Sequence, residues 1–395
     1  MRMDKSTPAV SVIVPVRNLA EYVEETVLDL LGQSFRDFEL ILIDGQSTDG
    51  TVEILKKLAE KDRRIDLYSY GPSGKIEEAI AVPYLAGIGQ FRTIHGQNGV
   101  SAARNFGLRR AKGRYVVFPD GDDRIDRNYL ECLLKAISTT SNTPKKVKGF
   151  RRMQVQLGMT GYTEISDEGK TLFQTPESGT RVLDKDDLLC RLLCTARDYS
   201  EEGAAAHKVP QEGPFPEPVL YPVLLNDESC LWNKILRRDN IEKYHIQFDE
   251  GLDRYAELLF LVDYVRRISA ARMSAERPYH YRIHDTTVMG NPPKRNISTK
   301  MLFREISGIE ALAKIRKLLR RSSDARWFCE QNLCYHTLIA YNHLEQAGGG
   351  RQKAAAAFRK WARLASHLPY EGFSDKDEVS LWHRMRRFGI WGRLP

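Results

Sequence analysis

The residues best suited to chemistry are three carboxylates in the run Phe118-Pro119-Asp120-Gly121-Asp122-Asp123. Acidic groups this close repel one another unless a cation neutralises them. Ligand sets made of oxygen alone suit hard divalent ions, Mg²⁺ or Mn²⁺, and such ions usually keep open positions for phosphate oxygens. The run therefore predicts a divalent metal site. A solvated acidic turn that caps the helix expected from Asp126 is the structural alternative.

The elements that must position this run form a regular alternation. Strands are expected at residues 10–15, 38–43, 65–68 and 115–118, and helices at 21–32, 52–59, 101–112 and 126–137. Such alternation with short links is typical of parallel strands joined by right-handed crossovers. Ligands of these sheets bind at the carboxyl ends of the strands, so the polar residues that follow each strand are the candidate site.

Six segments in order carry a family resemblance. They are VSVIVPVRN at 10–18, LILIDGQSTDG at 40–50, NGVSAARNFGLRRAKG at 98–113, YVVFPDGDD at 115–123, CLWNKILRRDNIEKYHIQFDEG at 230–251 and YHYRIH at 279–284. Together they resemble the inverting glycosyltransferases of family 2, over roughly residues 9–290. The resemblance implies a GT-A fold, which is an α/β fold with a Rossmann-like, mostly parallel central sheet.

The resemblance also implies roles on the side of a nucleotide-sugar donor. The loop after the first strand, with Pro15, Arg17 and Asn18, would hold the nucleobase and ribose, and Asp44 would bond the base. The family commonly has two successive acids at that point, whereas this chain has Asp44-Gly45. The segment from Asn98 would pack under the donor, and Arg104 would contact its diphosphate or sugar; a helix-face arginine paired with a carboxylate is the alternative.

Metal ligands follow from the same comparison. Asp120 and Asp122 match the two acids of the family's D-x-D motif, so Asp122 should hold Mn²⁺ or Mg²⁺ and Asp120 should hold the ribose, or the metal through water. Arg282 would supply a second cation for the diphosphate leaving group. His284 or His280 is a candidate further ligand, although a lone histidine is more often a packed or polar surface residue.

The acceptor hydroxyl needs a base, which the family supplies from an acidic pair at the start of an apolar helix. Here the chain has Ala256-Glu257 before Leu258-Leu259-Phe260. The register of the apolar positions favours Glu257 as the base, with Asp253 as the fallback. The alternative is that Glu257 is merely an acid favoured by the helix dipole in the first turn.

The acceptor itself should meet the region around Trp232 and Lys234, because this part of the family lines the acceptor side. An aromatic ring over a sugar face fits this role, and a core tryptophan is the alternative.

Two regions are expected along the chain, a catalytic domain over 1–295 and a helical region with a basic tail over 296–395. Residues 70–95 and 195–229 interrupt the pattern and are expected to be long loops. Helices are expected at 298–319, 325–346 and 352–368.

The last 45 residues hold ten Lys or Arg and four Asp or Glu, which leaves +6 of the chain's net charge of +8. The segment Leu381–Leu394 mixes Trp382, Met385, Phe388 and Trp391 with arginines. That mixture suits a lipid headgroup boundary, so peripheral contact with an anionic membrane is expected. The alternative is a docking helix whose aromatic residues pack on the chain's own core.

The amino-acid composition limits the classes of protein to which the chain can belong. Apolar residues make up 42% of the 395 residues and charged residues 28%, which excludes a wholly disordered chain. No apolar run approaches the length of a membrane span, and the N-terminus lacks a signal-peptide core, so a cytoplasmic protein is expected. The six cysteines include no C-x-x-C pair and are expected to be reduced thiols.

The predicted function is a metal-dependent inverting glycosyltransferase. It would move a sugar, expected to be UDP-linked, to a hydroxyl of a glycan, polymer or lipid-linked acceptor in bacterial cell-wall or surface-polysaccharide synthesis, with no nucleic-acid partner. Two alternatives remain at this point. One is a nucleotidyltransferase on the same type of sheet, although its glycine-rich basic signature is absent after the first strand. The other is a non-catalytic nucleotide-sugar or glycan-binding module, which the incomplete acidic pair favours.

Overall fold

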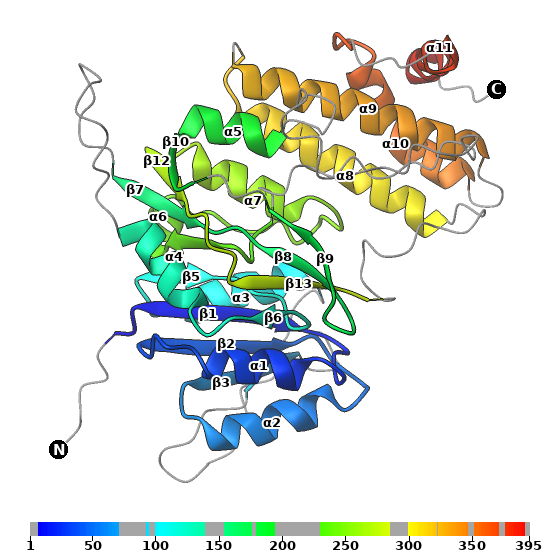
Figure 1. The fold of residues 1–395 in the computed structure, drawn as a ribbon. Helices are drawn as coiled ribbons and strands as arrows, with labels where there is room; N and C mark the ends of the chain where they lie inside the picture. Colours follow the sequence, from blue (N-terminus) through cyan, green and yellow to red (C-terminus); the bar gives the residue numbers. More distant parts are fainter. Residues whose placement is uncertain are drawn as a thin grey trace, which may run out of the picture. The chain divides into compact units, whose positions relative to one another are not determined.

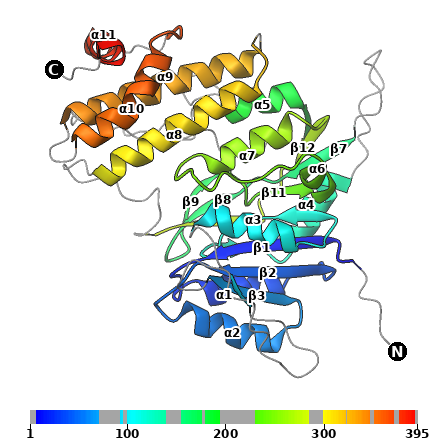
Figure 2. The same cartoon turned by 180° about the vertical axis from the view of Figure 1, so that it is seen from behind.

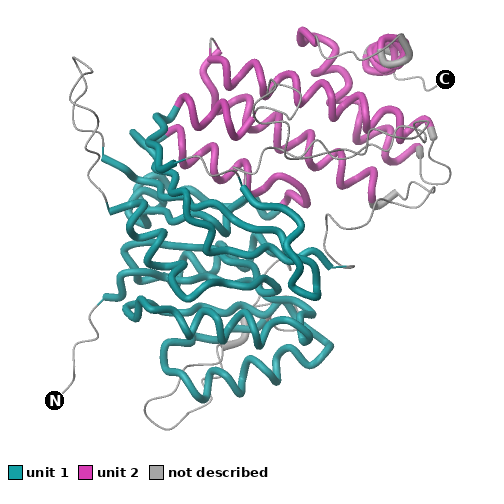
Figure 3. Tube along the Cα trace, viewed as in Figure 1, with its two compact units in different colours: residues 1–185, 230–250, 267–285 teal, residues 186–229, 251–266, 286–395 magenta. Residues whose placement is uncertain are grey.

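The computed structural model describes residues 7–70, 92–94, 99–138, 154–175, 179–193, 230–284, 299–321, 323–346, 351–370 and 376–391. The chain forms two compact units, and segments of the two units alternate along the sequence (Figure 3). The first unit is built from residues 1–185, 230–250 and 267–285, and the second from residues 186–229, 251–266 and 286–395. The boundary near 295 expected from the sequence remains a prediction.

A nine-stranded mixed sheet is the centre of the first unit (Figure 1). Its order is β10-β12-β7-β11-β5-β1-β2-β3-β4. The strands are β1 (Val10–Val16), β2 (Phe38–Asp44), β3 (Ile65–Tyr70), β4 (Arg92–Ile94), β5 (Tyr115–Val117), β7 (Val155–Met159), β10 (Arg181–Asp184), β11 (Lys234–Arg237) and β12 (Ala270–Met273). β1 to β5 run parallel, as expected, whereas β11 is antiparallel to both β5 and β7.

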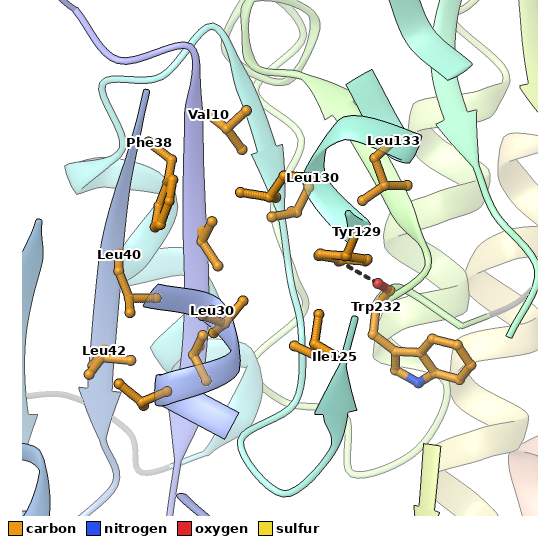
Figure 4. Packing of buried hydrophobic residues seen from close by; sticks show 14 of the residues in the cluster. Val10, Leu30, Phe38, Leu40, Leu42, Ile125, Tyr129, Leu130, Leu133 and Trp232 are labelled. Atoms are coloured by element: carbon orange, nitrogen blue, oxygen red, sulfur yellow. Dashed lines mark hydrogen bonds between the residues drawn. The ribbon is translucent and has the colours of Figure 1, made fainter. Parts of the chain in front are cut away.

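Helices cover both faces of this sheet, because successive side chains of a strand point to opposite faces. Val12 and Val14 of β1 belong to a buried cluster with Val27 and Leu30 of α1 (Val23–Leu31). Part of this cluster, with residues of α4 (Tyr129–Ser138), is drawn in Figure 4.

α3 (Val100–Arg110) packs on the opposite face of β1 and lies in front of the sheet in Figure 2. A Cβ added to Gly107 would lie 2.3 Å from Ile13, so only glycine allows this approach. α2 (Thr51–Lys61) packs beside β3, and α6 (Arg238–Lys243) follows β11 directly.

A second sheet of four strands also belongs to the first unit. Its order is β6-β13-β8-β9, from β6 (Arg124–Ile125), β13 (Tyr279–Ile283), β8 (Thr163–Ser166) and β9 (Thr171–Gln174). β13 pairs with β6, the strand that comes directly after the acidic run. This pairing brings residues near position 280 to the acids near position 120.

The second unit is helical. It contains α5 (Lys185–Leu193), α7 (Ala256–Val265), α8 (Thr299–Leu318), α9 (Asp324–Gln346), α10 (Arg351–Ala365) and α11 (Lys376–Trp391). The helices expected at 298–319, 325–346 and 352–368 are therefore present. Within the described residues, no helix combines the length and the apolar content that a membrane crossing requires.

The structure corrects the expectation that the apolar side chains of the last segment face lipid. Trp382, Met385 and Phe388 of α11 are buried. The Phe388 ring lies 5.7 Å from Tyr341 and 6.1 Å from Phe358, and Gly389 lies against the backbone of α10. α11 is thus a docking helix, as the alternative had it, because its apolar face is already covered by α9 and α10.

Candidate active site

The acidic run lies directly after β5, at the carboxyl end of the parallel strands, as predicted. Arg104 of α3 donates a hydrogen bond of 3.0 Å to Oδ1 of Asp120. The Arg104 side chain is only 2% exposed, whereas that of Asp120 is 32% exposed. The buried Arg104 guanidinium therefore holds the partly exposed Asp120 carboxylate in place by this hydrogen bond. This geometry matches both the predicted donor contact and its alternative, an arginine paired with an acid.

Asp122 is brought to the predicted histidine. Its Oδ2 lies 3.2 Å from Nε2 of His284, which follows β13 and is buried. The His284 ring stacks on Tyr22 at a centroid distance of 4.7 Å, which fixes the orientation of the imidazole. His280, the other candidate ligand, instead lies 2.9 Å from Asp126 and does not face the acidic run. The structure thus distinguishes between the two histidines.

Asp123, the third acid of the run, was included in the predicted metal site without an individual role. It is fully buried, accepts a 2.5 Å hydrogen bond from the Tyr279 hydroxyl and a 2.8 Å bond from the backbone N–H of Arg282. Burial and the nearby charges of Asp122 and Asp120 raise the pKa of Asp123 well above its ordinary value. Asp123 therefore anchors β13 to the acidic run. Its position in the same run as Asp120 and Asp122 was the available signal.

Arg282 lies beside this anchor and is also buried. Its guanidinium donates a 2.8 Å hydrogen bond to Glu25 of α1 and lies 5.0 Å from the centre of the Tyr22 ring. The bond from Arg282 lowers the pKa of Glu25. The predicted second cation is therefore near the acidic run, but its charge is shared with Glu25, a partner that the sequence did not indicate.

Asp44 lies at the carboxyl end of β2, buried completely. Its carboxylate accepts hydrogen bonds from the backbone N–H groups of Gln46 and Ser47, and one of 2.9 Å from the Ser69 hydroxyl. Asp44 thus holds the turn that follows β2. A contact with a nucleobase stays a prediction, which its remaining acceptor capacity allows.

The loop after β1 is tied to the same turn. Asn18, which has a positive φ of 52°, receives a hydrogen bond from the Thr48 backbone and donates its own N–H to Ser47. Pro15 is the penultimate residue of β1, and Arg17 is exposed beyond its end. Asn98 lies outside the described residues. Pro15, Arg17 and Asn18 thus occupy the sheet edge where a donor would be expected.

The prediction that Trp232 and Lys234 contact an acceptor is not supported by their surroundings. Trp232 is 6% exposed and stacks on Tyr279 at 4.5 Å, and its carbonyl accepts a bond from the Tyr129 hydroxyl (Figure 4). Lys234 is fully buried and its Nζ donates to the Cys230 carbonyl and to Asn233. The core alternative holds for Trp232, which lies in the aromatic layer that also holds Tyr279.

The two candidate bases belong to the second unit. Glu257 is in the first turn of α7, as expected, and is partly exposed. Asp253 is exposed three residues before the start of the helix, and its backbone N–H donates a hydrogen bond to the Ser307 hydroxyl of α8. Leu258, Leu261 and Val262 of α7 are buried, as are Ala256, Phe260 and Tyr264, and the assignment of Glu257 as the base stays a prediction.

A metal ion would have two side-chain ligands here. In the described part of the chain, no group of three or more His, Cys, Asp or Glu residues is placed to hold one. The Asp122 and His284 atoms are 3.2 Å apart, close to the separation of about 3 Å between neighbouring ligands around an ion with bonds of about 2.1 Å. The pair therefore fits an ion that takes its other ligands from water or from a substrate diphosphate.

Comparisons with known proteins agree with this geometry. The model of glycosyl transferase family 2 matches residues 11–71 and 72–153. An uncharacterised glycosyltransferase of Haemophilus influenzae is 36% identical over 124 residues, which are 31% of this chain and 40% of that protein. The putative teichuronic acid biosynthesis glycosyltransferase TuaG of Bacillus subtilis is 33% identical over 176 residues, 44% of this chain and 55% of that protein.

Solved structures show the same fold. TarS 1–349 of S. aureus, in a crystal structure with UDP, gives a TM-score of 0.52 at 15% identity, covering 97% of this chain and 92% of that one. The chain spans about half the length of the curated relatives named above. The family match covers β1 to β5 and the acidic run, and the structural match covers nearly all of the chain. Residues 11–153 thus carry a region of glycosyl transferase family 2, and the fold of the chain is GT-A.

Proposed function

We propose that this protein transfers a sugar from a nucleotide-sugar donor to a hydroxyl acceptor with inversion at the anomeric carbon. The observation that carries the proposal is the meeting of Asp122 with His284 beside the Arg104–Asp120 pair. These groups lie at the carboxyl end of a family 2 sheet, where ligands of parallel sheets bind.

The donor is proposed to be UDP-linked. Support comes from TarS, which has been crystallised in complex with UDP and with UDP-GlcNAc. TuaG is named for teichuronic acid biosynthesis, which supports a role in assembling a bacterial surface polysaccharide. The acceptor in this proposal is a glycan, a polymer or a lipid-linked precursor.

Asp122 and His284 are proposed to hold Mn²⁺ or Mg²⁺, with Asp120 as a contact through water or to the ribose. The imidazole nitrogen favours Mn²⁺ of the two, because Mg²⁺ prefers oxygen ligands. When bound, the ion would offset the negative charge that develops on the diphosphate as the glycosidic bond breaks. Arg282 and Arg104 would add positive charge from the protein itself.

Glu257 is the proposed base. The acceptor oxygen forms a bond to the anomeric carbon while the bond from that carbon to the diphosphate oxygen breaks, and the hydroxyl proton passes to the Glu257 carboxylate. The nucleoside diphosphate leaves with the bonding electron pair. Ala256 stands where the family has its glutamate, and this substitution keeps a donor-binding module as the second candidate function.

Contact with a membrane is proposed to be electrostatic only. Lys353, Lys360 and Arg363 of α10 and Arg386 and Arg387 of α11 are exposed, whereas the apolar face of α11 is buried. Basic side chains near an anionic surface contribute about 1 kcal/mol each, and salt screens the effect. Such contact would hold the protein at the inner face of the membrane without inserting it.

A donor panel tests the function. The protein is incubated with Mn²⁺ and a series of nucleotide sugars, and the released nucleoside diphosphate is measured with and without candidate hydroxyl acceptors. One donor is expected to release its nucleoside diphosphate slowly by hydrolysis, and faster when a hydroxyl acceptor takes the sugar. Binding of a donor without any turnover would favour the binding module, and release of pyrophosphate from a nucleoside triphosphate and a sugar phosphate would favour a nucleotidyltransferase.

A further inference from the structure

Tyr255, the residue before α7, has a backbone conformation that a tyrosine rarely adopts. Its φ is 61° and its ψ is 19°, in the left-handed region. A bulky residue there is strained and persists only where its surroundings hold it. The strained residue lies two positions before Glu257, so the surroundings of Tyr255 also bear on the candidate base.

Those surroundings are a polar cluster of the second unit, in which His336 is buried and the other side chains are partly buried. The Tyr255 hydroxyl lies 3.1 Å from Nε2 of His336 in α9, and Nδ1 of that histidine lies 3.9 Å from Glu305 in α8. Glu305 also pairs with Arg254, whose guanidinium lies 4.7 Å from the centre of the Tyr255 ring. The four side chains Arg254, Tyr255, Glu305 and His336 thus form one connected group, named here the α7 anchor.

Burial decides how this group is protonated. His336 is 1% exposed, and burial together with the charge of Arg254 lowers its pKa to about 3. The imidazole is therefore neutral near pH 7 and has one donor and one acceptor nitrogen. The arrangement that satisfies both neighbours places the proton on Nδ1, facing Glu305, and lets the Tyr255 hydroxyl donate to Nε2.

The backbone around Tyr255 is held from a second direction. A Cβ added to Gly308 of α8 would lie 3.1 Å from Arg254 and 3.2 Å from the Tyr255 ring, so α8 packs tightly against both residues. The Asp253 N–H bonds Ser307 of the same helix. Leu252 and Ala256 form a small apolar cluster with Ala311. The start of α7 is therefore fixed on α8 and α9.

We propose that Tyr255 is a positioning residue, which uses its bond to His336 to hold the first turn of α7 and with it the Glu257 carboxylate. The inference rests on the function proposed above. It explains why a strained tyrosine occurs at this point, because displacing a catalytic group by about 1 Å can cost roughly 100-fold in rate. The rest of the α7 anchor acts through Tyr255.

The test is a double-mutant cycle of Tyr255→Phe and Glu257→Gln, measured as donor KM and as kcat for transfer. Tyr255→Phe removes one oxygen atom and is expected to lower kcat about tenfold or more, with donor KM unchanged within about twofold. In the Glu257→Gln background the same change should have almost no further effect, because a misplaced base and an absent base are equivalent. Purely structural damage would lower kcat by the same factor in both backgrounds and would overturn the proposal.

Tyr335→Phe is the matched control. The Tyr335 ring also contacts His336, at 5.8 Å, but from α9 rather than from the start of α7. The Tyr335→Phe variant should leave kcat unchanged, and a loss of kcat equal to that of Tyr255→Phe would overturn the proposal. His336→Gln, which keeps an acceptor near Nε2, gives a second route and should lose less kcat than His336→Leu.

The outcomes separate this inference from the function on which it rests. If the wild-type protein transfers no sugar, the proposed function fails. If the wild type is active, Glu257→Gln is inactive and Tyr255→Phe retains full kcat, only the positioning role is wrong.

Discussion

Oδ2 of Asp122 lies 3.2 Å from Nε2 of His284, although 162 positions separate the two residues in the chain. The pairing of β13 with β6 brings them together, and the bonds of Asp123 to Tyr279 and to the Arg282 backbone hold that pairing in place. The carboxylate and the imidazole are therefore preorganised, since neither side chain has to move before a ligand binds.

Glu257→Gln should lower transfer by about 10²- to 10⁴-fold, the usual contribution of a general base. The amide is nearly isosteric with the carboxylate but cannot take the proton, so donor affinity should change little. Single-turnover transfer and donor titration measure the two effects separately. Asp253→Asn is the comparison: if it abolishes transfer while Glu257→Gln does not, the base has been assigned to the wrong acid.

Phe388→Ala should destabilise the second unit by about 3–5 kcal/mol, the usual cost of emptying a buried aromatic site. Phe388 is 2% exposed and packs with Tyr341 and Phe358. Thermal unfolding followed by circular dichroism measures the change. Arg386→Ala, on the exposed side of the same helix, should shift stability by no more than about 0.5 kcal/mol. Equal small effects of both variants would refute the docking role of α11.

Mild acid should weaken the second unit through His336. The unfolded chain takes up this proton near pH 6.5, whereas the folded pKa is about 3. Between these values the unfolded state binds more protons, so the free energy of unfolding falls as the pH drops from 6.5 toward 3. The slope is at most about 1.4 kcal/mol per pH unit for this group, and buried His343, whose pKa is also lowered, adds in the same direction.

Urea unfolding of wild type and His336→Gln at pH 7.5, 6 and 5 measures this effect. The variant should lose less stability than the wild type between pH 6 and pH 5, because it has no such proton to gain on unfolding. Identical slopes for the two proteins would show that His336 is not held neutral by burial.

Local pattern was enough to predict much of the first unit and three long helices of the second. Buried apolar runs followed by polar turns predicted β1, β2, β3 and β5, and helical spacing predicted α1 to α4 and α8 to α10 within a few residues. The family resemblance assigned both Arg104 and Asp120 to the donor side, and the structure brings the two side chains within 3.0 Å. The expected loops at 70–95 and 195–229 lie outside the described residues, except for residue 70, which ends β3, and residues 92–94, which form β4 rather than loop.

The remainder depends on contacts distant in sequence. The antiparallel insertion of β11 between β5 and β7, and the pairing of β13 with β6 and β8, join segments more than 70 residues apart. A tryptophan such as Trp232 could stack on a sugar ring. Only its position between Tyr162 and Tyr279 shows that it belongs to the hydrophobic core. The buried role of Asp123 likewise required a partner 156 residues away.

The most direct test of a metal-assisted nucleotide-sugar site is calorimetric titration of UDP. In the presence of Mn²⁺, wild-type protein should bind UDP, and EDTA or Asp122→Asn should weaken that binding at least about tenfold, as loss of a metal ligand requires. Asp37→Asn, at an exposed residue before β2, should bind as wild type does. Normal Mn²⁺-dependent UDP binding by Asp122→Asn, or no UDP binding by the wild type, would contradict the account.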